Sequence, residues 1–184
     1  MAAYAPSCAS GLRFGDNGGE LRIVSSTTVT KIPLRRFTAR VLPVDAQDRV
    51  LLLHGFDPKR PDEPFWFTIG GATEDGETLQ QAAARELYEE VGIRRDVEEF
   101  AGPYGTSTIE FIWADYAITQ DQTFFAIRTH DAAISFDHME QIEKETTTGH
   151  RWWSAEELEG TEETFFPEDL AAILRKVTAT GELG

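Results

Sequence analysis

The sequence has very little cysteine and few basic residues. Cys8 is the only cysteine among 184 residues, so no disulfide can form within one chain, and the chain suits a reducing compartment. Lysine and arginine number 17 against 32 aspartates and glutamates, which gives a formal net charge of -15. This balance argues against stable binding to nucleic acid, because lysine and arginine are needed to neutralise phosphates. A small anionic substrate remains compatible with it where metal ions accompany the substrate.

Long hydrophobic runs are also missing. No apolar stretch is long enough to cross a bilayer, and the first fifteen residues lack the basic segment and apolar core of a signal peptide. The charge balance likewise argues against an anionic membrane surface. We therefore expect a cytoplasmic protein that does not associate with membranes. The length and composition fit a soluble globular chain with one adequate core.

Acidic residues gather in residues 71–93, which contain six carboxylates and a single arginine. Within this segment a helix is predicted over Leu79–Val91, because Thr78 and Gln81 form a capping box and Gly92 follows as a C-cap. The helix contains no glycine or proline and is rich in alanine, leucine and glutamate.

The predicted helix brings glutamates together on its packed side. Glu86 and Glu90 are one turn apart on the same face as the apolar residues, and Glu89 lies beside them. Two like charges at this spacing weaken a helix, and they raise the pKa of at least one of the two carboxyl groups unless a cation neutralises them. Oxygen ligands without histidine or cysteine favour Mg²⁺ or Mn²⁺ over Zn²⁺. The alternative is a solvated acidic surface with a few Glu-Arg pairs.

The order of residue types in residues 71–93 is more specific than their charge. Gly71 is followed after five residues by Glu77, and after seven more by Arg-Glu-Leu, any residue, Glu-Glu, any residue and Gly-Ile. This order resembles the Nudix box and matches it at every fixed position. The resemblance implies an α/β fold, the Nudix-type α/β/α sandwich, with a mixed β-sheet and the box in a loop-helix-loop.

The resemblance also implies metal ligands. Divalent metals, Mg²⁺ or Mn²⁺, are expected on Glu86, Glu89 and Glu90, and a backbone carbonyl at or beside Gly71 is expected to join them. Glu74 lies in the loop before the helix, where it reaches either a second metal or only solvent.

Further residues are expected to act in catalysis. In the family the arginine that Arg85 matches pairs with the glutamate that Glu77 matches, which orients the loop-helix junction and leaves the other carboxylates free. A general base or further ligand usually follows the box. Glu143 and Glu145 in the acidic residues 139–145 are the candidates, and the alternative is that they belong to a mobile polar loop. Glu110 is a third option, on a predicted strand.

The reaction implied by the resemblance is hydrolysis of a pyrophosphate linkage. Family members cleave a nucleoside diphosphate joined to another group, NDP-X, into NMP and X-phosphate, and the expected partner is such a small molecule. Two alternatives stay open: a non-catalytic domain that senses a nucleotide or sugar nucleotide, and an RNA 5′-end pyrophosphohydrolase. The acidic balance argues against the RNA enzyme. The substrate itself is not indicated by any motif.

The chain divides into an N-terminal extension, residues 1–33, and a Nudix hydrolase domain, residues 34–184. The extension is expected to be partly flexible because residues 1–20 are rich in Gly, Ala and Ser. Residues 21–33 contain the β-branched residues that favour a strand. This strand either pairs with a second subunit, which would give a homodimer, or is an edge strand or ordered tail of its own domain.

The remaining elements are predicted from periodicity. Residues 50–53 form a continuous apolar run, typical of a strand that is buried on both faces. A short helix opens with the capping box at Ser154, and a last helix begins at Pro167 with an amphipathic pattern. The predicted strands cover residues 37–44, 49–55, 64–71, 107–118, 122–129 and 150–154.

Overall fold

The computed structural model describes residues 31–113, 116–130, 133–181 and 183. Seven strands in this part of the chain form one mixed sheet in the order β4-β5-β1-β2-β3-β7, and β6 pairs with β2 outside this path. The strands are β1 (Ile32–Val44), β2 (Val50–Asp57), β3 (Arg60–Phe67), β4 (Ala101–Trp113), β5 (Tyr116–Arg128), β6 (Thr147–Trp153) and β7 (Phe165–Phe166). The helices are α1 (Leu79–Val91), η1 (Val97–Glu99), α2 (Gln141–Thr146), α3 (Ala155–Gly160) and α4 (Leu170–Ala179).

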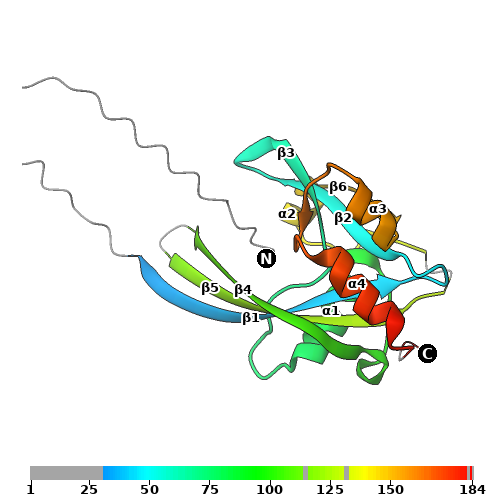
Figure 1. Ribbon diagram of the computed structural model, residues 1–184. Helices are drawn as coiled ribbons and strands as arrows, with labels where there is room; N and C mark the ends of the chain where they lie inside the picture. The colour runs from blue at the N-terminus through cyan, green and yellow to red at the C-terminus, as the bar shows by residue number, and fades with distance from the viewer. Residues whose placement is uncertain (1–30, 114–115, 131–132, 182, 184) are drawn as a thin grey trace, which may run out of the picture.

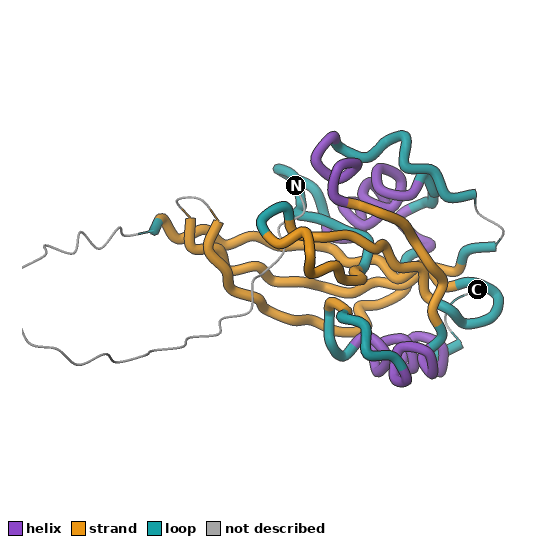
Figure 2. Tube along the Cα trace, turned by 90° about the horizontal axis from the view of Figure 1, so that it is seen from above, coloured by secondary structure: helices purple, strands orange, loops and turns teal. Residues whose placement is uncertain are grey.

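Helices cover both faces of the sheet. Figures 1 and 2 show α1 on one face and α3 with α4 on the other. Each face of the sheet therefore has its own hydrophobic core. Side chains along β1 alternate between the two cores: Val41 packs toward α1 and Leu42 toward α4. This three-layer arrangement confirms the predicted α/β/α sandwich with a mixed sheet. None of the helices within the described ranges is long and apolar enough to span a membrane.

Strands β1 and β2 separate soon after the turn that joins them. They pair only at Val44 and Val50, and the chain that leaves β3 then lies alongside β1 instead. The Val41 N–H donates to the Ile69 carbonyl at 2.8 Å. After β3, which pairs with β2, the chain thus moves over to pair with β1. This places Gly71, the first residue of the box, against the middle of the sheet.

Local sequence rules predicted several elements correctly. Helix α1 spans the predicted residues, Thr78 and Gln81 form the expected capping box, and Gly92 ends the helix in the left-handed region with φ 75°. The apolar run at the start of β2 is buried on both faces, as expected. In α4 the residues spaced at i, i+3, i+4 and i+7 are all buried: Leu170, Ile173, Leu174 and Val177.

Other predicted boundaries were wrong. The segment predicted as one strand, residues 107–118, is divided between β4 and β5, and β5 also contains the predicted strand 122–129 except for its last residue. The reason is that residues 107–118 contain no glycine or proline to signal a break. The last helix begins at Leu170, three residues after the predicted start, and its N-cap residue Asp169 makes no side-chain capping bond. Residues 167–169 instead form a turn after β7, in which the Leu170 N–H donates to the Pro167 carbonyl at 3.2 Å. The acidic residues 139–145 are not a loop, since most of them belong to α2.

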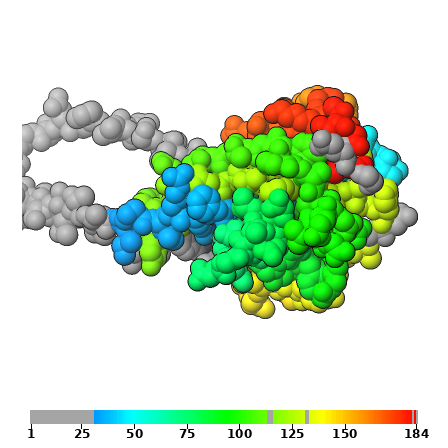
Figure 3. Space-filling model, turned by 90° about the horizontal axis from the view of Figure 1, so that it is seen from below, coloured from blue at the N-terminus to red at the C-terminus, as the bar shows by residue number. Residues whose placement is uncertain are grey.

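Strands β1, β4 and β5 extend past the helical layers as an arm, defined here as residues 32–37, 109–113 and 116–120. Figure 3 shows this arm projecting from the rounded body. Phe111 and Ile118 form a small cluster of their own within it. Most of the large hydrophobic side chains that are exposed in the described residues lie on the arm: Ile32, Leu34, Phe37, Ile112 and Tyr116.

Only the last three residues of the predicted N-terminal strand, residues 21–33, lie within the described part of the chain. Ile32 belongs to β1 and is the register partner of Tyr116 in β5 of the same chain. Cys8 also lies outside the described residues. The homodimer stays a prediction, and the exposed apolar side chains of the arm are the kind of surface that such an interface uses.

Candidate active site

Helix α1 holds two glutamates beneath the glycine pair that opens the box. Glu86 is 6 % exposed and Glu90 is 3 % exposed, so both carboxyl groups face the sheet. The Gly70 N–H donates to Glu90 Oε2 at 3.3 Å. A Cβ at Gly71 would lie 2.2 Å from Glu86 Oε1. Glycine at this position thus leaves room for the Glu86 carboxylate against the backbone, and a larger residue would displace that carboxylate.

The buried carboxyl groups oppose one another electrostatically. Burial, together with the nearby Glu86 and Glu143 carboxyls, raises the pKa of Glu90 well above its usual range. Burial also raises the pKa of Glu86, although Arg85 opposes this, and burial raises the pKa of Glu143. Without a cation, ionising these three carboxyl groups together costs free energy. A divalent cation would remove that cost, so the electrostatics fit a metal site.

Arg85 connects the loop of the box to α1. Its Nε and Nη2 atoms donate to the two carboxyl oxygens of Glu77, each at 3.0 Å, which confirms the expected pair. Partial burial opposes ionisation of Glu77, but the hydrogen bonds from Arg85 hold its pKa below the ordinary value. The expectation that the other carboxylates are left free was wrong. The Nη1 atom also donates to Glu86 at 2.8 Å and to Glu89 at 2.9 Å, because the guanidinium has five donors and lies among three carboxylates.

One cavity brings the box together with helix α2. It has a volume of about 300 Å³, and its walls come from β1, the box loop, α1 and the start of α2. The lining residues are Arg36, Ala72, Thr73, Glu74, Arg85, Glu86, Glu89, His138, Glu140 and Glu143. The cavity therefore contains most of the charged residues that the resemblance singled out.

The three candidates for a downstream base lie in different surroundings. Glu143 lines the cavity, and its charge raises the pKa of Glu90. Glu145 is exposed and accepts a hydrogen bond from Gln141 at 2.8 Å. Glu110 is exposed on the edge strand β4. Of these candidates, the structure brings only Glu143 to the carboxylates of α1.

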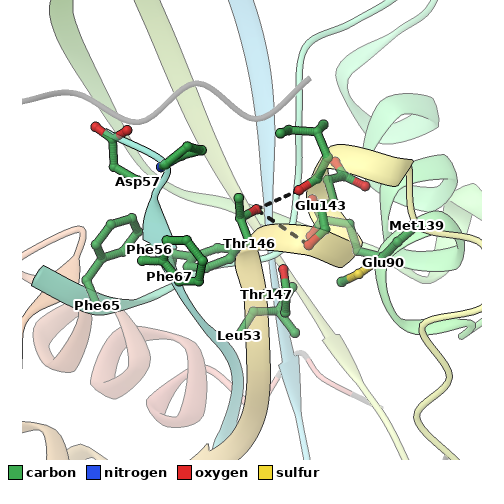
Figure 4. A pocket seen from close by; sticks show the side chains of 12 residues that line it. Leu53, Phe56, Asp57, Phe65, Phe67, Glu90, Met139, Glu143, Thr146 and Thr147 are labelled. Carbon is green, nitrogen blue, oxygen red and sulfur yellow. Dashed lines mark hydrogen bonds between the residues drawn. The ribbon is translucent and has the colours of Figure 1, made fainter. Parts of the chain in front are cut away.

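An apolar pocket of about 140 Å³ adjoins the carboxylates. Figure 4 shows the rings of Phe56, Phe65 and Phe67 on one side of it and Glu90 and Glu143 on the other. This apolar wall borders both carboxyl groups, and burial is the first cause of their raised pKa values.

Two arginines near the site had not been singled out from the sequence. Arg40 is buried, and its Nη1 donates to the Gly70 carbonyl at 2.6 Å, which fixes the backbone beside Glu90. Arg36 lines the cavity from β1. The available signal was the presence of charged residues inside a strand of otherwise apolar pattern, since a buried charge requires a partner.

Within the described ranges, no three His, Cys, Asp or Glu side chains surround one point as a preformed metal cage. Mg²⁺ does not require such a cage, because it keeps several waters and binds through one or two carboxylates together with substrate phosphates. The donor set here consists only of oxygen atoms, from Glu86, Glu89 and Glu90 beside Gly71. The residues present therefore fit Mg²⁺ or Mn²⁺.

Comparison with known proteins agrees with this geometry. A family model described as the NUDIX domain matches residues 34–178. The chain is 38% identical over 79 residues to dihydroneopterin triphosphate diphosphatase of Escherichia coli K12, a match that covers 42% of this chain and 50% of that protein. The chain thus spans about half the length of the curated relatives it matches.

Solved structures show the same fold. The E. coli dihydroneopterin triphosphate pyrophosphohydrolase has a TM-score of 0.57 and 23% identity, covering 82% of this chain and 100% of that one. A C. elegans Ap4A hydrolase has a TM-score of 0.52 and 19% identity, covering 79% of this chain and 96% of that one.

Proposed function

Because the chain belongs to the Nudix family, we propose that it is a divalent-metal-dependent hydrolase of a pyrophosphate linkage. The proposed substrate is a nucleoside diphosphate derivative, NDP-X, which is cleaved into NMP and X-phosphate. The observation that carries this proposal is geometric: Glu143 lines the apolar pocket together with Glu90 and the cavity together with Glu86, while the backbones of Gly70 and Gly71 lie against Glu90 and Glu86. Relatives named for dihydroneopterin triphosphate and for Ap4A support a small phosphoric anhydride as the substrate.

Each residue of the box has a role in this proposal. Glu86, Glu89 and Glu90, with the carbonyl of Gly71, would hold Mg²⁺ or Mn²⁺. The metal supplies Lewis-acid stabilisation of phosphoryl oxygens and a more acidic bound water. Arg85 orients the loop through Glu77 and balances the charge of Glu86 and Glu89. Arg40 holds the Gly70 carbonyl in place, which keeps the adjacent Gly71 backbone in position.

Glu143 is the proposed downstream base or further ligand. It lies on α2 and lines the cavity together with Glu86 and Glu89, and burial raises its pKa, which is the direction expected for a general base. We expect Glu143→Gln to lower kcat by about a hundredfold, in the range of general-base catalysis. The matched control is Glu145→Gln, in the same helix but exposed, which should retain activity close to that of the parent. Equal losses in the two variants would remove Glu143 from this role.

A nucleotide panel tests the reaction. Purified protein with Mg²⁺ or Mn²⁺ should release NMP from at least one nucleoside diphosphate derivative, and chelation of the metal should abolish release. Folded protein that turns over no member of the panel would contradict the proposal. Ligand binding without product would indicate a sensor domain, and preferential cleavage of RNA 5′ ends would indicate the polymer enzyme.

A further inference from the structure

The apolar pocket beside the carboxylates has a buried floor and an exposed rim. Phe65, Phe67 and Met139 form the floor, and all three are buried members of the hydrophobic core on the α1 face. The ring centroids of Phe65 and Phe67 lie 5.8 Å apart. Ile142 on α2 lines the same pocket and is 46 % exposed, so the pocket opens to solvent. The floor is held in place by core packing, and the pocket is therefore preformed.

The pocket meets the cavity of the candidate active site at Glu143. Glu143 lines both of them, and Glu90 lines the pocket while Glu86, one turn earlier on α1, lines the cavity. Figure 4 shows the phenylalanine rings on the side of the pocket opposite these carboxyl groups. A substituent on a phosphoryl group that is bound at Glu86 and Glu90 would therefore lie next to the pocket.

Polar side chains of the pocket are already engaged by the protein. The Thr146 hydroxyl donates to the Ile142 carbonyl at 2.9 Å, and the Asp57 carboxylate accepts from the Lys59 N–H at 2.9 Å. A nucleobase or a sugar carries donors and acceptors around its edge, and burying these against phenylalanine rings without partners costs free energy. A hydrocarbon group loses no hydrogen bonds there. The lining thus favours a hydrocarbon group over a nucleobase or a sugar.

We propose that the group X of the substrate NDP-X is a hydrocarbon group of about the size of one aromatic ring, bound among Phe56, Phe65 and Phe67. This assignment rests on the proposed function, because it takes Glu86 and Glu90 to hold the diphosphate through the metal. The pocket has a volume of about 140 Å³, and an apolar cavity of about 150 Å³ holds one benzene molecule. A phenyl ring or a branched chain of about five carbons fits this volume.

The reaction leaves the hydrocarbon group unchanged. Water adds to one phosphorus atom as the bridging P–O bond of the diphosphate breaks, which gives NMP and X-phosphate. The C–O bond between X and its phosphate stays intact. The pocket therefore contributes binding and orientation, and the chemistry takes place at the carboxylates beside it.

Esters of ADP and of UDP test the size and polarity of X. An isopentyl ester buries about three more carbons than an ethyl ester, and each buried methylene contributes about fourfold. We therefore expect kcat/KM for the isopentyl ester to exceed that for the ethyl ester by about fiftyfold, and to exceed that for ADP-ribose as well. Chromatography of the NMP released with Mg²⁺ measures these values. Equal values for the two alkyl esters, or a preference for ADP-ribose, would overturn the assignment.

Two variants change the pocket without changing the carboxylates. Phe56→Ala removes one ring of the wall, and Phe56 belongs to neither hydrophobic core of the described residues. It should lower the ratio of isopentyl to ethyl activity by about tenfold. Ile142→Ser makes the exposed rim polar and should lower the same ratio several-fold with the fold intact.

Ile112→Ser is the matched control. Ile112 has a similar exposure, 54 %, but it lies on β4 and lines neither the pocket nor the cavity. This variant should keep the isopentyl/ethyl ratio of the parent. The assignment is wrong if both pocket variants also keep that ratio. It is equally wrong if they change the ratio of ADP to UDP esters instead, because the pocket would then hold the nucleobase.

Non-hydrolysable analogues separate recognition of X from the reaction. In these analogues a methylene group replaces the bridging oxygen of the diphosphate. Calorimetric titration with Mg²⁺ should show the isopentyl analogue binding about fiftyfold more tightly than the ethyl analogue, and Ile142→Ser should reduce this difference. If no ester is hydrolysed but this preference is found, the proposed function fails and the assignment of the pocket is supported. If the esters are hydrolysed but the two analogues bind equally, the assignment fails and the proposed function stands.

Discussion

Glu90→Gln is expected to lower kcat by about a thousandfold while leaving the fold at least as stable as that of the parent. The change keeps the shape of the side chain but removes the charge of a proposed metal ligand. Loss of several kcal/mol of transition-state stabilisation corresponds to about this factor. Steady-state kinetics at saturating Mg²⁺ measures it. Activity within a few-fold of the parent would show that Glu90 is not a ligand.

The effect of the same variant on stability follows from the raised pKa of Glu90. The folded state holds the proton more tightly than the unfolded state, so ionisation of Glu90 destabilises the fold as pH rises above the usual carboxyl range. Glutamine has no such cost. In urea unfolding at neutral pH without metal, the variant should match or exceed the parent, and any advantage should shrink toward the unfolded carboxyl pKa of about 4.3.

Metal binding gives the complementary measurement. Mg²⁺ binds only the folded state in this proposal, so it should raise the Tm of the parent by several degrees and that of Glu90→Gln much less. The control is Glu98→Gln, an exposed residue of η1, which should change neither activity nor the response to Mg²⁺. A Glu90→Gln variant that is clearly less stable than the parent without metal would mean that the hydrogen bond from Gly70 outweighs the cost of burying the charge.

Gly70→Ala is expected to cost about 3 kcal/mol or more of unfolding free energy. The residue has φ 130°, a conformation that side chains rarely adopt, and its added Cβ would lie 2.1 Å from the Ala39 carbonyl oxygen. This neighbour is backbone in β1, so it cannot rotate away, and the strand would have to move. Because the same backbone donates to Glu90, activity should fall together with stability.

Two other glycines separate the effect of backbone strain at positive φ from the effect of a steric clash with the added Cβ. Gly76 has φ 80° but open space around its Cβ position, so Gly76→Ala should cost only about 1 kcal/mol. Gly149 has open space and no positive φ, so Gly149→Ala should change stability little. Urea unfolding of the three variants gives the comparison. Equal costs at Gly70 and Gly76 would show that β1 accommodates the added atom.

The sequence by itself determined the parts that depend on near neighbours. Helix α1 has the predicted bounds, because its capping box, its composition and Gly92 all act within a few residues. The pairing of Arg85 with Glu77 follows from the same short segment, in which the loop returns to the first turns of the helix. The layers of the sandwich follow from alternation along the strands and from the amphipathic pattern of α4.

Only the tertiary structure decided which distant residues meet at the site. Glu143 and Glu145 are alike in sequence terms, yet the packing of α2 against β2 and β6 places one at the cavity and leaves the other exposed. Arg36 and Gln120 are 84 residues apart and meet because β1 and β5 pair in one register. No local pattern encodes such a register, since it is set by the burial of whole strand faces. The reaction is thus indicated by one continuous segment, whereas the residues that complete the walls of the cavity, Arg36 and Glu143, reach it only through long-range packing.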